Sequence, residues 1–130
     1  MTNRDGPSVW KVKRSLCSIY VKDGYLYAIG SKTREGRLGM VWVYDNPLDI
    51  RGGRRGKTLS DYGGEFVMHH SKREEGREWW ITRAPAWPLR GKYFKLFRRS
   101  ADDHSFVTVV KLTDRGFVVL KDSGRGSRRR

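Results

Sequence analysis

Short stretches in which apolar and polar residues alternate dominate the chain. The alternation begins in residues 8–14 and resumes in residues 17–21, before the strong tight-turn signal Asp23-Gly24. A period of two residues is typical of half-buried strands. The segment 40–44 is instead apolar throughout, as in a central strand. We therefore predict strands over 8–14, 17–21, 25–29, 40–44, 65–70, 78–84, 92–99, 105–113 and 116–121.

Signals for helices are weak. No window repeats apolar residues at three- and four-residue spacings beside a capping residue, and the best candidate, 72–80, has Gly76 at its middle. The pattern predicts an all-β fold: a single small antiparallel barrel or strongly curved sheet of about eight or nine strands, with little helix.

The chain length of 130 residues fits one domain, predicted over 8–122. Residues 1–7 and the basic tail 123–130 are expected to be disordered, because the tail is too polar to pack. Within the domain, residues 49–64 are predicted to form a long Gly/Arg-rich loop. Its glycines and arginines are compatible with an anion-binding nest, with a disordered RNA-binding segment or with a plain flexible loop.

The charge of the chain changes this picture most. It carries 28 Lys plus Arg against 14 Asp plus Glu, a net charge of +14, and the middle part 51–100 has 13 basic and 5 acidic residues. Such an excess costs self-repulsion on folding, which a polyanionic partner would relieve. Nucleic acid is favoured over a membrane because no basic amphipathic helix and no apolar run of about 20 residues is visible.

Cysteine content and the N-terminal sequence bear on the compartment. A single cysteine, Cys17, allows no intrachain disulfide and suits a reducing environment. The first ten residues contain no apolar signal core. We expect an intracellular, cytoplasmic protein that is not secreted.

The richest candidate chemistry lies in residues 78–99. This stretch combines Trp79, Trp80 and Trp87 with six basic residues, and Arg77 stands just before it. Nucleic acid offers stacking faces and phosphates, so rings interleaved with cations suit it. The structural alternative is that a tryptophan beside β-branched residues belongs to the core.

Alternation also predicts which cations face outward. If Val12 and Ile19 face the core, the neighbouring lysines and Tyr20 lie on the surface. The predicted phosphate contacts are Lys11, Lys13, Lys22, Arg54, Arg55, Lys95 and Arg99, and the predicted stacking residues are Tyr20, Trp79, Trp80 and Trp87. The alternative is that these residues form ordinary solvated sheet faces, on which lysines oppose aggregation.

Catalytic and metal chemistry has little support. His69 and His70 are sequence neighbours, so in a strand they point to opposite faces and do not share one metal. A metal-independent ribonuclease that uses one of them with His104 is the third functional hypothesis. No phosphate-binding loop, dinucleotide fingerprint or nucleophile elbow is present. We therefore expect no cofactor, no metal and no enzymatic activity.

One hairpin has a recognisable pattern. Residues 17–34 contain Ser18-Ile19, Lys22, a turn, Leu26, Ala28, Gly30 and Ser31-Lys32-Thr33, and Asp45-Asn46-Pro47-Leu48 follows. This pattern resembles the small RNA-silencing suppressors of tombusviruses and aureusviruses, although the second motif has a different place in the chain order. The resemblance implies binding of double-stranded RNA on a concave sheet through phosphates and 2′-hydroxyls, with duplex ends bracketed by tryptophans in the tombusvirus members. The chain lacks the helices of that family, including the C-terminal dimer helix, so a shared dimer geometry is not implied.

These observations lead to three functional hypotheses. The first is a non-enzymatic RNA-binding protein, with double-stranded RNA favoured, which the resemblance would make a viral suppressor of RNA silencing. The second is a basic protein-interaction or inhibitor module, such as a viral or phage anti-defence factor, that docks on an acidic partner. The third is the ribonuclease. A homodimer and a protein partner both remain open.

Overall fold

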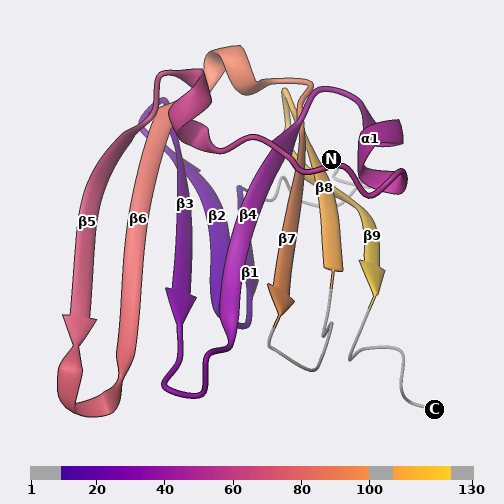
Figure 1. Ribbon diagram of the computed structural model, residues 1–130. Coiled ribbons are helices and arrows are strands. Elements are labelled where there is room, and N and C mark those ends of the chain that lie inside the picture. Colours follow the sequence, from indigo (N-terminus) through magenta and orange to yellow (C-terminus); the bar gives the residue numbers. More distant parts are fainter. Residues whose placement is uncertain (1–9, 100–106, 124–130) are drawn as a thin grey trace, which may run out of the picture.

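The computed structural model describes residues 10–99 and 107–123, and its fold is nearly all β, with 61% strand and 13% helix. Each predicted strand is confirmed, with shifts of a few residues at the ends. The strands are β1 (Lys11–Arg14), β2 (Cys17–Lys22), β3 (Tyr25–Lys32), β4 (Leu38–Tyr44), β5 (Glu65–Lys72), β6 (Arg77–Pro85), β7 (Tyr93–Arg99), β8 (Val107–Thr113) and β9 (Gly116–Ser123) (Figure 1). Of the predicted disordered termini, 1–7 and 123–130, all but Ser123 lie outside the described residues, and the backbone of Ser123 ends β9.

Short helices replace part of the predicted irregular loop. Helix α1 (Pro47–Arg51) begins because the Asn46 side chain accepts a hydrogen bond from the Leu48 amide and because Pro47 suits the first helical turn. A 3₁₀ turn, η1 (Leu59–Tyr62), follows, and its Asp61 carboxylate accepts from the Thr58 amide. Two further 3₁₀ turns are η2 (Arg73–Glu75) and η3 (Trp87–Leu89). No helix in the described parts of the chain is long and apolar enough to cross a bilayer.

The sheet branches at β3. The main path runs β1-β2-β3-β4-β7-β8-β9, all antiparallel. Along one edge, β3 pairs first with β2 and then, only at Ser31 and Lys32, with β4. The other edge pairs with β6 over its full length, and β6 pairs with β5. We call the β5–β6 hairpin, residues 65–85, the wing. Figure 1 shows it at one side of the molecule.

The main path curls until β1 approaches β8 and β9. Arg14 on β1 donates to Thr108 Oγ1 at 3.1 Å and to the Asp122 carboxylate at 2.9 Å. Thr108 Oγ1 donates to the same carboxylate at 2.7 Å. These bonds bring the two ends of the path together, and the result is a nearly closed barrel-like sheet.

One core fills the barrel. Ile19 and Leu26, from β2 and β3, are fully buried with Phe94, Leu96 and Val110 from β7 and β8. Burial of such side chains is the main favourable contribution to folding. Because both halves of the barrel direct their alternate residues into this core, their remaining residues face outward on opposite sides of the molecule.

Candidate nucleic-acid interface

One outward surface of the barrel combines rings and cations in register. We call it the β3 face, and it contains Lys11, Lys13, Tyr20, Lys22, Tyr25, Tyr27, Arg77, Trp79 and Arg83. The neighbours of these residues along each strand, such as Val12, Ile19 and Leu26, are buried, so alternation turns the face to solvent. Its central row runs across four strands, with each residue directly opposite the next: Lys11, Tyr20, Tyr27 and Arg83.

Arg83 organises this row. Its guanidinium lies 4.5 Å from the centre of the Tyr25 ring and 6.0 Å from that of Tyr27. It also donates to the Tyr27 hydroxyl oxygen at 3.3 Å and to Glu65 at 2.8 Å. The hydrogen bonds to Tyr27 and then Glu65 raise the pKa of Arg83, so its charge is constant in the physiological range. The arginine is therefore held in place by rings and a carboxylate.

The tyrosines beside it form a stacked pair. The rings of Tyr20 and Tyr27 lie 4.8 Å apart and are nearly parallel, with an angle of 6° between their planes. Burial, followed by the influence of Tyr27, raises the pKa of the Tyr20 hydroxyl, which keeps it protonated. Since each ring already has a partner on one face, the hydroxyl groups are the parts best placed to act as hydrogen-bond donors and acceptors.

Trp79 lies further along the same face and also has partners of its own. The Arg77 guanidinium is 5.1 Å from its ring centre, and the His70 ring stacks on it at 5.5 Å. The sequence predicted Trp79 to stack on bases. In the structure its ring surface is shared with these two side chains, so a base would have to compete with them.

The lysines of the β3 face are exposed and available. Among the described residues, no carboxylate forms an ion pair with Lys11, Lys13 or Lys22. Lys22 lies directly opposite Tyr25 at the β2–β3 turn. Five predicted binding residues, Lys11, Lys13, Tyr20, Lys22 and Trp79, thus share this surface.

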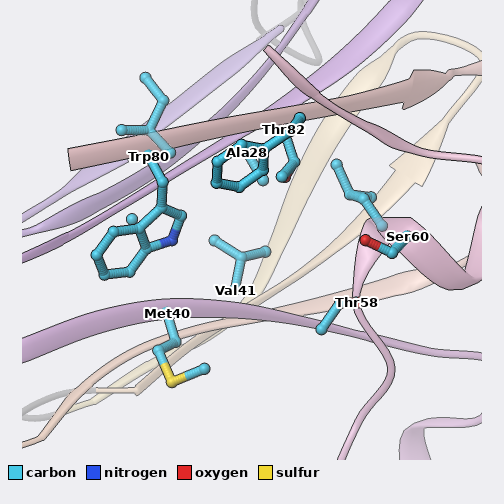
Figure 2. Close-up of a pocket in the computed structure, with 11 residues that line it drawn as sticks. Ala28, Met40, Val41, Thr58, Ser60, Trp80 and Thr82 are labelled. Atoms are coloured by element: carbon cyan, nitrogen blue, oxygen red, sulfur yellow. The ribbon is translucent and has the colours of Figure 1, made fainter. Parts of the chain in front are cut away.

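Trp80 points to the other side of β6, away from the β3 face. Its indole lies across Gly30, where an added Cβ would stand 2.4 Å from the indole nitrogen. Figure 2 shows it pointing into a cleft of about 220 Å³ above Met40 and Val41. This cleft lies between the wing, β3 and β4, with Phe66 at its side. Trp80 therefore belongs to a different surface from Trp79, its neighbour in sequence.

Three predicted cations lie on the far side of the barrel or beside it. Lys95 projects from β7, 5.6 Å from the centre of the Trp42 ring, and Arg55 approaches the same ring at 5.9 Å. Arg54 pairs with Asp49 at 3.7 Å, and its carbonyl accepts from the Tyr44 hydroxyl. The backbone of Arg99 belongs to β7, but its side chain lies outside the described residues.

Trp87 occupies the end of the barrel. It is 70% exposed in η3, and the Arg90 guanidinium lies 3.6 Å from the centre of its ring. Arg90 also pairs with Asp114 in the β8–β9 turn. The four tryptophan and tyrosine residues predicted to stack therefore occupy three separate places in the fold.

Four residues of the β3 face were missing from the predicted set: Tyr25, Tyr27, Arg77 and Arg83. The tight turn at Asp23-Gly24 carried a signal for the tyrosines, since a two-residue turn sets Lys22 opposite Tyr25 and Tyr20 opposite Tyr27. No local signal placed Arg83 beside them, because its strand is far away in sequence.

The histidines do not form a joint site. As predicted, His69 and His70 face opposite sides of β5: His69 lies 3.3 Å from Glu78, and His70 stacks on Trp79. His104 lies outside the described residues. Within 10–99 and 107–123, no group of three His, Cys, Asp or Glu side chains is arranged to hold a metal ion.

Comparisons of the chain with models of known protein families, with curated proteins and with solved structures find no match.

Proposed function

We propose that the protein binds RNA on the β3 face without chemical catalysis, and that double-stranded RNA is its preferred form. The observation that carries this proposal is the cross-strand row of Lys11, Tyr20, Tyr27 and Arg83, flanked by lysines that no carboxylate of the described residues pairs with. A fixed positive surface with hydroxyl donors suits a phosphate backbone.

The geometry favours recognition of the backbone over stacking on bases. The rings of Tyr20 and Tyr27 face each other, and the Trp79 ring already contacts Arg77 and His70. What these residues offer to a ligand is charge and hydroxyl groups. Duplex RNA is read mainly through phosphates and 2′-hydroxyls, because its deep major groove is closed to side chains.

The cellular role that we propose is suppression of RNA silencing by a virus. Support comes from the sequence resemblance described above: its hairpin, residues 17–34, forms β2 and β3 at the centre of the β3 face. Sequestering duplex RNA is sufficient for such a role and requires no active site.

The experiment is a titration of the protein against matched single- and double-stranded RNA and DNA at two salt concentrations. We expect the tightest binding to duplex RNA. The double variant Lys11→Gln/Lys22→Gln should weaken binding to all sequences alike and lower the salt slope by about 1.8, about 0.9 for each lost phosphate contact. An unchanged slope in this variant would remove the β3 face from the site.

A matched control removes the same charge elsewhere. Lys32 alternates to the other side of β3, and Arg37 lies in the exposed β3–β4 loop. Lys32→Gln/Arg37→Gln should retain nearly all of the affinity. An equal loss in both double variants would show that only the net charge matters, and it would contradict a localised site.

A second candidate function, protein binding, is favoured by the edge of the wing. Among the described strands β5 pairs only with β6, and its Phe66, Val67 and Met68 are 63%, 46% and 44% exposed. An apolar edge strand is a template for an added strand from a partner. Met68→Lys should abolish capture of such a partner while RNA affinity is retained; loss of RNA affinity alone would oppose this function. No specific observation favours the ribonuclease.

A further inference from the structure

A second surface of the barrel gathers cations on the side opposite the β3 face. We call it the β7 face, and it contains Trp42, Tyr93, Lys95, Lys111 and Lys121 from β4, β7, β8 and β9, together with the buried Phe97. Val109 lies directly between Lys95 and Lys121, one strand from each, and Lys111 lies opposite Tyr93. In the described parts of the chain, no carboxylate forms an ion pair with any of these three lysines.

Aromatic rings support these cations. The Lys95 ammonium is 5.0 Å from the centre of the Phe97 ring and 5.6 Å from that of Trp42. The Lys111 ammonium is 5.5 Å from the Tyr93 ring centre. Contacts of this kind attract a cation and orient it. The lysines are therefore held at the surface in defined places.

In the protein alone, two effects destabilise the charged form of Lys95. Lys95 is half-buried, and burial, followed by repulsion from Lys121, lowers the pKa of its ammonium group. Both effects disfavour the charged form, and a bound anion would offset both. The cations follow a surface across three strands instead of surrounding a cavity, which suits an extended polyanion better than a single phosphate ion.

The two faces cannot contact the same short segment of nucleic acid. The inward neighbours of the β7 face, Phe94, Leu96 and Val110, share the core with Ile19 and Leu26 behind the β3 face. Two packed sheets lie about 10 Å apart, so a complete core layer separates the faces.

We propose that the β7 face is a second nucleic-acid-binding surface and that one molecule bridges two RNA segments, one on each side of the barrel. This inference rests on RNA binding by the β3 face. It gives a place in recognition to Lys95, which the first face does not include, and to Arg55, whose guanidinium approaches the Trp42 ring of the β7 face.

The test mixes two RNA duplexes of the same sequence, one with a donor dye and one with an acceptor, and titrates in the full-length protein. Bridging by one molecule predicts energy transfer that rises and then falls, because excess protein saturates each duplex separately. For Lys95→Gln/Lys121→Gln we expect at least a tenfold loss of maximal transfer, with affinity for a single duplex within about threefold of the unaltered protein. Lys32→Gln/Arg37→Gln is the control of equal charge and should keep the transfer.

The outcomes separate this inference from the proposed function. Tight binding of single duplexes with no energy transfer would overturn bridging and leave RNA binding by the β3 face intact. Weaker binding of single duplexes and a lower salt slope in Lys11→Gln/Lys22→Gln, together with normal folding by circular dichroism, would support the first face. Transfer that persists in Lys95→Gln/Lys121→Gln would also overturn bridging; sedimentation of the protein alone would then show whether a dimer brings the duplexes together.

Discussion

Strands β3 and β5 have the same length, eight residues, but very different surroundings. Buried and exposed residues alternate along most of β3, which has strand partners along both edges. Every residue of β5 is exposed, and among the described strands it pairs only with β6. The barrel strand is thus stabilised by a core, whereas the wing strand is stabilised by one ladder and by a few side-chain pairs.

This difference shows that a segment can form a strand without burying either of its faces. The segment forming β5 contains Phe66, Val67 and Met68, yet these side chains stay 63%, 46% and 44% exposed to solvent. Both faces of β5 are exposed, whereas β6 buries Ala84 in the core and lies beside η1 and the cleft of Trp80. Apolar residues of β5 are therefore available for contacts with other molecules.

The largest expected effect comes from removing a phenylalanine ring from the barrel, compared with removing one from the wing. Phe94→Ala removes a fully buried ring from the core and should lower the free energy of unfolding by about 3–5 kcal/mol. Phe66→Ala, in the wing, should change it by less than about 1 kcal/mol because the ring is 63% exposed. Urea unfolding followed by tryptophan fluorescence measures both; equal losses would show that the wing is packed as tightly as the barrel.

The next effect concerns the buried thiol of the barrel. Burial raises the pKa of Cys17 from 9.0 to about 12. Below pH 9 the thiol is neutral in both states; between pH 9 and 12 only the unfolded chain ionises, so stability should fall as pH rises, by up to about 1.4 kcal/mol per unit. Urea unfolding at pH 8 and pH 10 should show a steeper loss than in Cys17→Ala. Identical slopes would contradict the assignment.

The reactivity of the buried Cys17 thiol can also be compared with that of a cysteine placed in the wing. Cys17 should resist a thiol reagent at pH 8 until the protein unfolds. In Cys17→Ala/Met68→Cys the thiol lies in the exposed wing and should react within the mixing time of the reagent. Rapid labelling of the natural cysteine in folded protein would show that the barrel opens easily.

An effect of comparable size is expected where the barrel meets the wing. In Gly30→Ala the added methyl group would stand 2.4 Å from the Trp80 indole and 2.8 Å from the Gly39 carbonyl oxygen. We expect a loss of about 1–3 kcal/mol and a shift in Trp80 fluorescence. Gly36→Ala does not serve as a control, because the backbone φ of Gly36 is +89° and a side chain there is strained even in open space. Stability equal to that of the unaltered protein would mean that the indole has room to move.

The smallest effect is local and requires no substitution. Amide hydrogens of β5 should exchange with solvent at least tenfold faster than those of β8, because among the strands of 10–99 and 107–123 β5 has one partner and β8 has two. Hydrogen exchange read by NMR tests this directly. Equal protection in both strands would indicate that the wing has a partner, such as a second copy of the chain.

Much of the fold could be predicted from the sequence. The number and places of the strands follow from local alternation, and the turn at Asp23-Gly24 sets the register that stacks Tyr20 on Tyr27. Alternation also identified Lys11 and Lys22 as outward residues and placed His69 and His70 on opposite faces. These properties depend on residues close together in the chain, so the sequence alone was enough.

Only the tertiary structure decided which of these outward residues share a surface. Arg83 meets Tyr27 across 56 positions of sequence, Trp79 and Trp80 separate to two sides of β6, and Lys95 lies across the core from Lys11. Such neighbours arise when distant strands pair and the sheet branches, and no local period encodes the choice of partner. The sequence determined that the protein is a basic, ring-rich β structure; the pairing at β3 decided that its cations form two faces.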